Sequence, residues 1–179
     1  LLKILFDRNK NLNLRGLDMC PEELELAGSR LKNSGVDLIK SKAQNLTAIN
    51  DNSIDIVLCH WALTLMDPIA PVLNEVRRVL TSRGRFAALV DGPMNAAPGY
   101  ADVHNLIYSY AQEEIPSYGK IDLGDSRIRG RESLSNLVHK TFPEANITIE
   151  TNVVTIEGPV NQVSEIAAGF FYAAFILKP

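Results

Sequence analysis

The sequence has little of what several protein classes need. Its 179 residues include only two cysteines, Cys20 and Cys59, too few for a disulfide framework, and this fits a reducing compartment. No apolar run approaches the roughly 20 residues of a membrane-spanning helix, and Leu1–Phe6 is too short and too soon polar for a signal peptide. With 18 basic against 21 acidic residues, the chain lacks the basic excess typical of nucleic-acid-binding proteins. We therefore expect a cytoplasmic protein that has no membrane span and binds no nucleic acid.

The sequence does contain a regular alternation of strand and helix patterns. Hydrophobic residues make up 46% and charged residues 22% of the chain, which is ordinary for a folded domain. Short apolar runs alternate with helical periodicity, and we find no internal repeat and no linker. This pattern predicts βαβ units around a mainly parallel sheet, in a single α/β domain over residues 1–179.

The expected elements follow from these patterns. In the first half we expect strands at 12–18, 36–40, 54–59 and 85–90, and helices at 21–33 and about 69–80. In the second half we expect helices around 103–110, 134–142 and 159–170, a surface loop at 115–130 and a strand at 147–156. The apolar tail at 170–177 either continues the last helix, which we favour, or forms a final strand.

One acidic residue ends the first expected strand. Gly16-Leu17-Asp18-Met19 leads directly into the helix that Pro21 opens. Ligands of parallel sheets bind beyond the carboxyl ends of the strands, where an acid can accept both ribose hydroxyls. An aspartate at the end of a strand is also a common helix cap, so this feature alone leaves both roles open.

Further motifs follow in a characteristic order. They are Asn45-Leu46, Asp51-Asn52-Ser53-Ile54-Asp55-Ile56-Val57, Leu73-Asn74-Glu75-Val76-Arg77-Arg78-Val79-Leu80 and Gly84-Arg85-Phe86. In order and spacing, residues 12–90 resemble the class I S-adenosylmethionine-dependent methyltransferases, and most closely the small-molecule branch that includes ubiquinone- and biotin-pathway enzymes. The resemblance implies a Rossmann-like three-layer αβα sandwich with S-adenosylmethionine as cofactor and a small-molecule acceptor. It implies a cofactor-binding core at 1–90, an acceptor or lid segment at 91–146, and a C-terminal strand and helix at 147–179.

The resemblance assigns residues to the ribose and adenine ends of the cofactor. Asp18 would hold the ribose hydroxyls, and Met19 would lie against the adenine with its polarizable thioether. Ala43 and Gln44 would read the adenine edge through backbone groups. The family usually has an acid just before this pair, whereas this chain has Lys42, which cannot accept the bond from the adenine amino group. Either that contact is lost or the alignment is displaced by one residue.

At the methionine end, the resemblance implies that Cys59 and His60 line the cofactor, with Trp61 as a wall of the pocket. In-line transfer from a sulfonium depends mostly on positioning and on exclusion of water, so a general base is optional. His60 and His104 are the candidates for such a base, although a structural or surface role is the commoner one for each. We expect no metal site.

Four of the five tyrosines fall between residues 99 and 119: Tyr100, Tyr108, Tyr110 and Tyr118. They would either form a lid over an apolar or aromatic acceptor or pack a helix against the sheet. Acceptor specificity is expected in this segment, because loops on a rigid scaffold are where specificity tends to lie.

The family's glycine-rich loop has no counterpart, because no Gly-x-Gly pair occurs anywhere in the chain. Too few residues precede Asp18 to supply a first strand, that loop and a complete helix. We expect the chain to begin where the family's first helix ends, and the family's last strand to be absent if the tail is helical. Without the first strand, the strands at 12–18 and 54–59 would lack their shared neighbour, at considerable cost in unpaired backbone groups. The sequence is then either a piece of a longer protein, which that cost favours, or a degenerate relative.

Two other functions stay open at this point. A catalytically inactive scaffold or partner subunit with the same fold would explain the missing loop and Lys42. A nicotinamide-dependent oxidoreductase would also use the acid at the ribose, but the dinucleotide fingerprint is missing. No Tyr-x-x-x-Lys pair stands out either, since Tyr110 is followed four residues later by Glu114.

Overall fold

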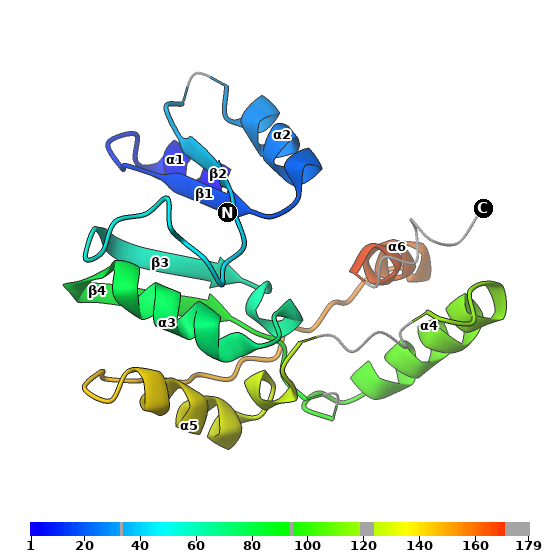
Figure 1. Ribbon diagram of the computed structural model, residues 1–179. Coiled ribbons are helices and arrows are strands. Elements are labelled where there is room, and N and C mark those ends of the chain that lie inside the picture. Colours follow the sequence, from blue (N-terminus) through cyan, green and yellow to red (C-terminus); the bar gives the residue numbers. More distant parts are fainter. Residues whose placement is uncertain (33, 94, 119–123, 171–179) are drawn as a thin grey trace.

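The computed structural model describes residues 1–32, 34–93, 95–118 and 124–170 (Figure 1). The elements of the first half are α1 (Leu2–Arg8), β1 (Arg15–Asp18), α2 (Pro21–Arg30), β2 (Asp37–Lys40), β3 (Ile54–His60), η1 (Leu63–Leu65), α3 (Ile69–Val79) and β4 (Leu80–Leu89). Those of the second half are α4 (Tyr100–Glu114), η2 (Ser126–Ile128), α5 (Arg131–Thr141) and α6 (Val160–Phe170). No helix among these residues is both long and apolar enough to cross a membrane.

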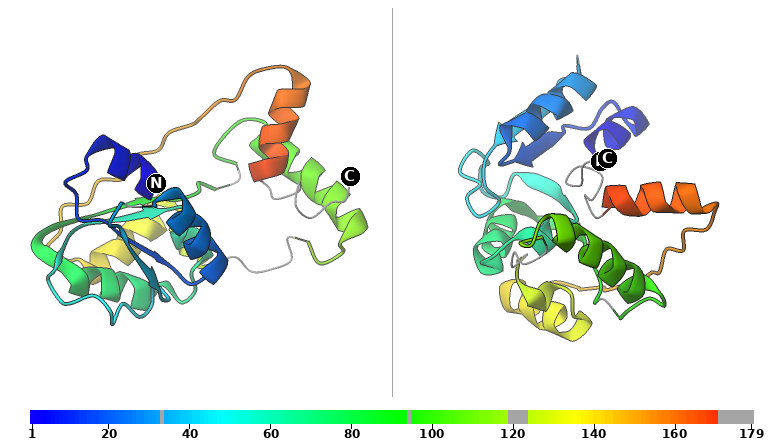
Figure 2. Two further views of the ribbon diagram at one scale, coloured as in Figure 1. Left: turned by 90° about the horizontal axis from the view of Figure 1, so that it is seen from above. Right: turned by 90° about the vertical axis from the view of Figure 1, so that its right-hand side faces the viewer.

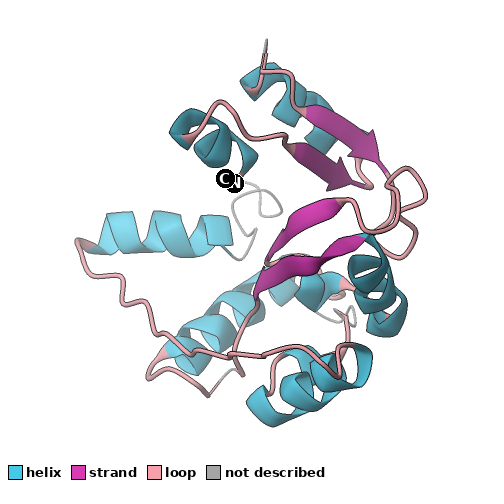
Figure 3. Ribbon diagram, turned by 90° about the vertical axis from the view of Figure 1, so that its left-hand side faces the viewer, coloured by secondary structure: helices cyan, strands magenta, loops and turns pink. Residues whose placement is uncertain are grey.

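The strands form two separate parallel pairs (Figure 3). β1 pairs with β2, which places Asp18 opposite Lys40, and β3 pairs with β4, which places His60 opposite Leu89. Within the described ranges β1 and β3 share no ladder. The expected α/β fold with parallel strands is therefore confirmed, and the gap falls between the two strands that we expected to lack a shared neighbour.

Helices lie on opposite faces of these strands, so the fold has three layers. On one face of β1–β2, Leu38 contacts α2 at Gly28, and the α carbon of Gly16 lies close to Leu2 of α1. Leu17 and Ile39 alternate to the other face, where they pack against the cluster of Leu46, Ile49 and Val79, the last of which belongs to α3. The described part of the chain thus has α1 and α2 in one layer, and α3 and its neighbour α5 in the other.

The core lies between α3, β3–β4 and α5. Helix α3 buries one apolar face, as its sequence spacing predicts, and begins immediately after Pro68. Its cluster with η1, η2 and α5 consists of Leu63, Ile69, Val72, Leu73, Ile128 and Leu137. Burial of Ile128, which is 1% exposed, shows that the expected surface loop at 115–130 contributes to the core near its end.

Two further expectations are wrong. The strand expected at 85–90 begins earlier, because α3 ends at Val79 and β4 starts directly at Leu80, which pairs with Ile54. The expected strand at 147–156 does not form: this segment is extended, but no described strand pairs with it, and Val154 is 84% exposed. Alternation predicts which face of a strand is buried, but a strand also needs a neighbouring edge. Helix α6 forms as expected, and residues 171–179 lie outside the described part.

Candidate functional site

The residues expected to bind the cofactor lie together at one edge of the strands. Asp18 ends β1, Ala43 and Gln44 occupy the turn after β2, and Cys59 and His60 end β3. Since the strands of each pair are parallel, these ends face one edge, towards the right in Figure 1, where α4 and α6 also lie. This is the edge at which open α/β sheets bind ligands.

Asp18 is held by its backbone and by one side-chain oxygen. Its carbonyl accepts from the Ser41 N–H at 3.0 Å, and its Oδ1 accepts from the Cys20 N–H at 2.8 Å. The N-cap of α2 is Cys20, so Asp18 is not the helix cap that was its alternative role. Among the described residues nothing donates to Oδ2 of Asp18, so a carboxylate oxygen remains at the edge to accept from a ribose hydroxyl.

The turn after β2 is closed by its own backbone. The Asn45 N–H donates to the Lys42 carbonyl at 2.9 Å, and Ser41 Oγ donates to the Asn45 carbonyl at 2.6 Å. Ala43 and Gln44 are half-buried within this turn, whereas Lys42 is exposed. Backbone groups of the pair therefore lie at the edge without help from the Lys42 side chain.

Met19 follows Asp18 and is 63% exposed. Its thioether is open to contact by a planar group, which suits a flexible and polarizable side chain.

The end of β3 supplies a neutral thiol and an exposed ring. Burial raises the pKa of the Cys59 thiol, although the N–H groups of Leu63 and Ala62 oppose that shift. Cys59 is therefore no nucleophile at neutral pH. His60 is exposed, and its ring centroid lies 5.0 Å from that of Trp61. Trp61 has a positive φ of 56°, and its backbone N–H donates to the Leu89 carbonyl.

Aromatic rings line one side of α4. The ring of His104 lies 3.8 Å from that of Tyr108 and 6.3 Å from that of Tyr100, and Tyr118 meets Tyr108 edge-on at 4.9 Å. Tyr110 is 61% exposed and lies elsewhere on the helix. In Figures 1 and 2 the ribbon of helix α4 stands away from the strands.

Tyr100 is the first residue of α4. Its pKa is raised, chiefly by burial and then by the negative charge of Asp91, which follows β4 by two residues. The phenol therefore stays protonated at neutral pH and is a hydrogen-bond donor there.

The sequence motif at 73–80 contains an interaction that sequence reasoning missed. Glu75 and Arg78 form an ion pair on α3, and both also bind the backbone of the loop after β2. Their spacing of three residues on a helix was the available signal.

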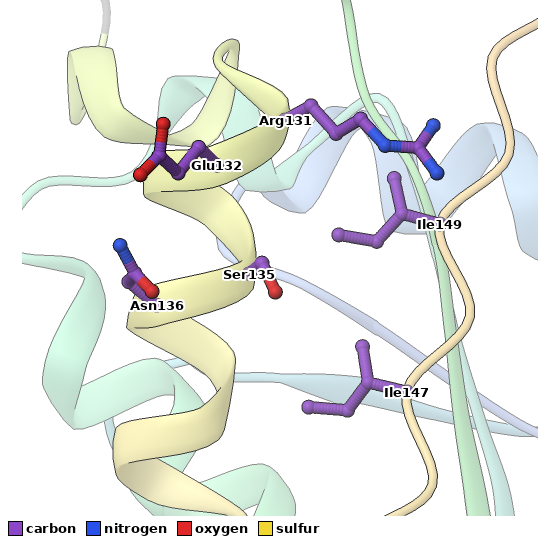
Figure 4. Close-up of a pocket in the computed structure, with 6 residues that line it drawn as sticks. All are labelled: Arg131, Glu132, Ser135, Asn136, Ile147 and Ile149. Atoms are coloured by element: carbon purple, nitrogen blue, oxygen red, sulfur yellow. The ribbon is translucent and has the colours of Figure 1, made fainter.

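Two hollows lie away from this edge. One, of about 390 Å³, lies between α5 and the segment at 147–149, where Ile147 and Ile149 point toward the helix (Figure 4). The other, of about 1000 Å³, separates β4 from residues 144–148. Neither is lined by a residue expected to bind the cofactor.

Comparison with known proteins agrees with this geometry. Residues 1–88 match the family described as "Methyltransferase domain". The YcgJ protein from Bacillus subtilis is 22% identical with a TM-score of 0.52, over 72% of this chain and 51% of that one. A structure of the Haloferax volcanii Trm112 methyltransferase activator with a candidate methyltransferase is 22% identical with a TM-score of 0.54, over 76% and 54%.

A candidate sarcosine dimethylglycine methyltransferase from Galdieria sulphuraria is 15% identical with a TM-score of 0.56, over 78% of this chain and 48% of that one. These solved structures support the fold, and the chain spans about half the length of each of them. The match over residues 1–88 supports a class I methyltransferase domain in this part of the chain, a family whose cofactor is S-adenosylmethionine.

Proposed function

We propose that this chain contains the ribose- and adenine-binding half and the acceptor-binding segment of a methyltransferase that acts on a small molecule. The observation that supports this best is Asp18, whose carboxylate stands at the carboxyl end of β1 beside the turn at 42–45, with one oxygen unused by the described residues. A carboxylate that accepts both ribose hydroxyls is the expected partner of a nucleoside at this edge.

The chemistry that the bound cofactor supplies is a methyl group on a positively charged sulfur, open to in-line displacement by an acceptor lone pair. The residues of this chain then have three tasks. Asp18 holds the ribose, and the backbone of Ala43 and Gln44 contacts the adenine edge while Met19 covers the ring. Cys59 and His60 line the methionine end, where the neutral thiol of Cys59 adds no competing nucleophile. Catalysis of this kind rests on positioning and exclusion of water.

The rings of α4 are proposed as the acceptor wall. Tyr100, near Asp91 at the strand edge, donates a hydrogen bond to the acceptor, and His104 and Tyr108 extend a flat surface away from it. Such a surface favours an acceptor with an aromatic or planar apolar part, because offset stacking adds about 0.5–1.5 kcal/mol per ring pair. His104 is also the one candidate base that lies on this surface, and His60 lies at the strand end.

Calorimetric titration with S-adenosylhomocysteine tests the proposal on the 179-residue chain. The wild type should bind, and Asp18→Ala should raise Kd by at least about tenfold, because hydrogen bonds to a charged group contribute roughly 1.5–3 kcal/mol each. Asp37→Ala is the matched control: it removes an exposed aspartate from the other end of the same strand pair and should leave Kd unchanged.

Absence of binding by the wild type would overturn the proposal and favour a non-catalytic relative. Equal losses of affinity in Asp18→Ala and Asp37→Ala would contradict the proposed contact between Asp18 and the ribose. The intact mass of the protein from its source, compared with 19.7 kDa, then shows whether a longer chain should be used in the search for the acceptor.

A further inference from the structure

The loop between β2 and β3 is fastened to α3 by two charged side chains. Glu75 Oε2 accepts from the Leu46 N–H at 2.6 Å, and Arg78 Nη2 donates to the Leu46 carbonyl at 2.9 Å. The backbone N–H and the carbonyl of Leu46 are therefore both hydrogen-bonded to side chains of α3, from residues 29 and 32 positions further along the chain. Arg78 Nη1 also donates to the Ile49 carbonyl at 3.0 Å.

The two side chains also hold each other. Arg78 Nε donates to Glu75 Oε1 and Nη2 donates to Glu75 Oε2, each at 2.8 Å, which makes the pair bidentate. Asp51 is a second, more exposed acidic partner of Arg78. Bidentate pairs restrict orientation as well as adding energy, so Glu75 and Arg78 present a fixed set of donors and acceptors to the loop.

The residue that this pair fixes comes directly after the turn at 42–45. That turn is fastened at its other side by the Ser41 N–H, which donates to the Asp18 carbonyl, and Ser41 Oγ donates to the Asn45 carbonyl. Leu46 itself is 8% exposed and packs with Ile49 and Val79. Hydrogen bonds therefore hold the turn at 42–45 to the end of β1 on one side and to α3 on the other.

We infer that Glu75 and Arg78 are positioning residues for cofactor recognition: they set the conformation in which the backbone of Ala43 and Gln44 contacts adenine. This inference rests on the proposed function of that turn. Neither side chain needs to touch the cofactor, since both act through Leu46. If loss of the pair left only about one-tenth of the molecules with the turn in its binding conformation, the Kd for the adenine ligand would rise about tenfold.

The test compares two ligands that differ only in the base. S-adenosylhomocysteine and S-inosylhomocysteine share the ribose and the amino-acid part, so the ratio of their Kd values reports on recognition of adenine. In the wild type the adenine ligand should bind more tightly. Arg78→Ala should raise its Kd about tenfold and bring the ratio of the two Kd values close to one.

Three further variants allow the result to be interpreted even if Arg78→Ala folds poorly. Glu75→Gln retains an acceptor for the Leu46 N–H but weakens the pair, so it should give a smaller change of the same kind. Asp51→Asn changes only the exposed partner of Arg78 and should leave the ratio unchanged. Leu137→Ala, a core substitution on α5, should lower Tm without changing the ratio.

A lower Tm in Arg78→Ala and Glu75→Gln with the wild-type Kd ratio would overturn the inference, because the pair would then only stabilise the fold. A wild type that binds neither ligand would overturn the proposed function and this inference with it. A wild type that binds S-adenosylhomocysteine and loses affinity in Asp18→Ala but not in Arg78→Ala would overturn this inference alone.

Discussion

At the scale of single residues, Gly16 shows how closely the N-terminal layers approach. A Cβ built at this position would lie 2.9 Å from Leu38 Cδ2 and still closer to Leu2 of α1. Gly16→Ala should therefore lower the free energy of unfolding by about 1–3 kcal/mol, as overpacking does. Urea denaturation monitored by circular dichroism measures the change.

Gly28→Ala is the control for Gly16→Ala, because Gly28 of α2 faces the same side of the β1–β2 pair. A methyl group there would meet Leu38 Cδ1 at an ordinary 3.6 Å, and Gly28 lies inside α2. Alanine should stabilise this position by about 0.5–1 kcal/mol, because glycine loses more conformational freedom on folding. A neutral Gly16→Ala would contradict the expected overpacking and show that the Leu2 and Leu38 side chains move aside.

At the scale of elements, the contact between α3 and the loop after β2 depends on the charge of Glu75. Hydrogen bonds from Arg78, the largest cause, and from the Leu46 N–H lower the pKa of Glu75 from its ordinary value of 4.5. A group with a lowered folded pKa stabilises the fold above its unfolded pKa, and this stabilisation is lost as the pH falls through the folded pKa. We expect the stability difference between wild type and Glu75→Gln to shrink between about pH 6 and pH 3.

Chemical denaturation of both proteins across that range measures the difference. Glu132→Gln is a suitable control, because Glu132 is an exposed glutamate on α5, and this variant should follow the wild type at every pH. A constant difference between wild type and Glu75→Gln would show that the carboxylate gains nothing from Arg78 in the folded state.

At the scale of the whole molecule, one face of β3–β4 is open. Ile56, Leu58 and Leu89 lie on the face opposite α3 and are 59%, 41% and 49% exposed. Contiguous apolar surface of this kind promotes association. We expect the 179-residue chain to self-associate, and the double variant Ile56→Thr with Leu58→Thr to shift it toward monomer in sedimentation velocity.

Leu12→Thr provides the control for the open face, because Leu12 is 44% exposed but lies in the loop before β1. This substitution should leave the sedimentation profile unchanged. A wild-type chain that stays monomeric at high concentration would contradict the expected role of this face.

The sequence by itself determined the features that depend on local pattern and order. Helix α3 follows from the spacing of its apolar residues, and the strand that ends at Asp18 follows from the leucine-rich segment at 12–17 before the helix that Pro21 opens. The order of motifs between 45 and 86 was enough to indicate the family, and the match over residues 1–88 agrees. The resemblance to that family, rather than local pattern, nominated Asp18, Ala43, Gln44, Cys59 and His60, and they lie at one edge because the parallel strands end there.

Only the tertiary structure decided which of these patterns found partners. The segment at 147–156 has strand-like alternation but no adjacent edge among the described residues, so it remains unpaired. Glu75 and Arg78 look like ordinary helix-surface charges until the loop at 46–49 is folded against them. Both outcomes depend on contacts between residues distant in sequence, and a local pattern does not specify such contacts.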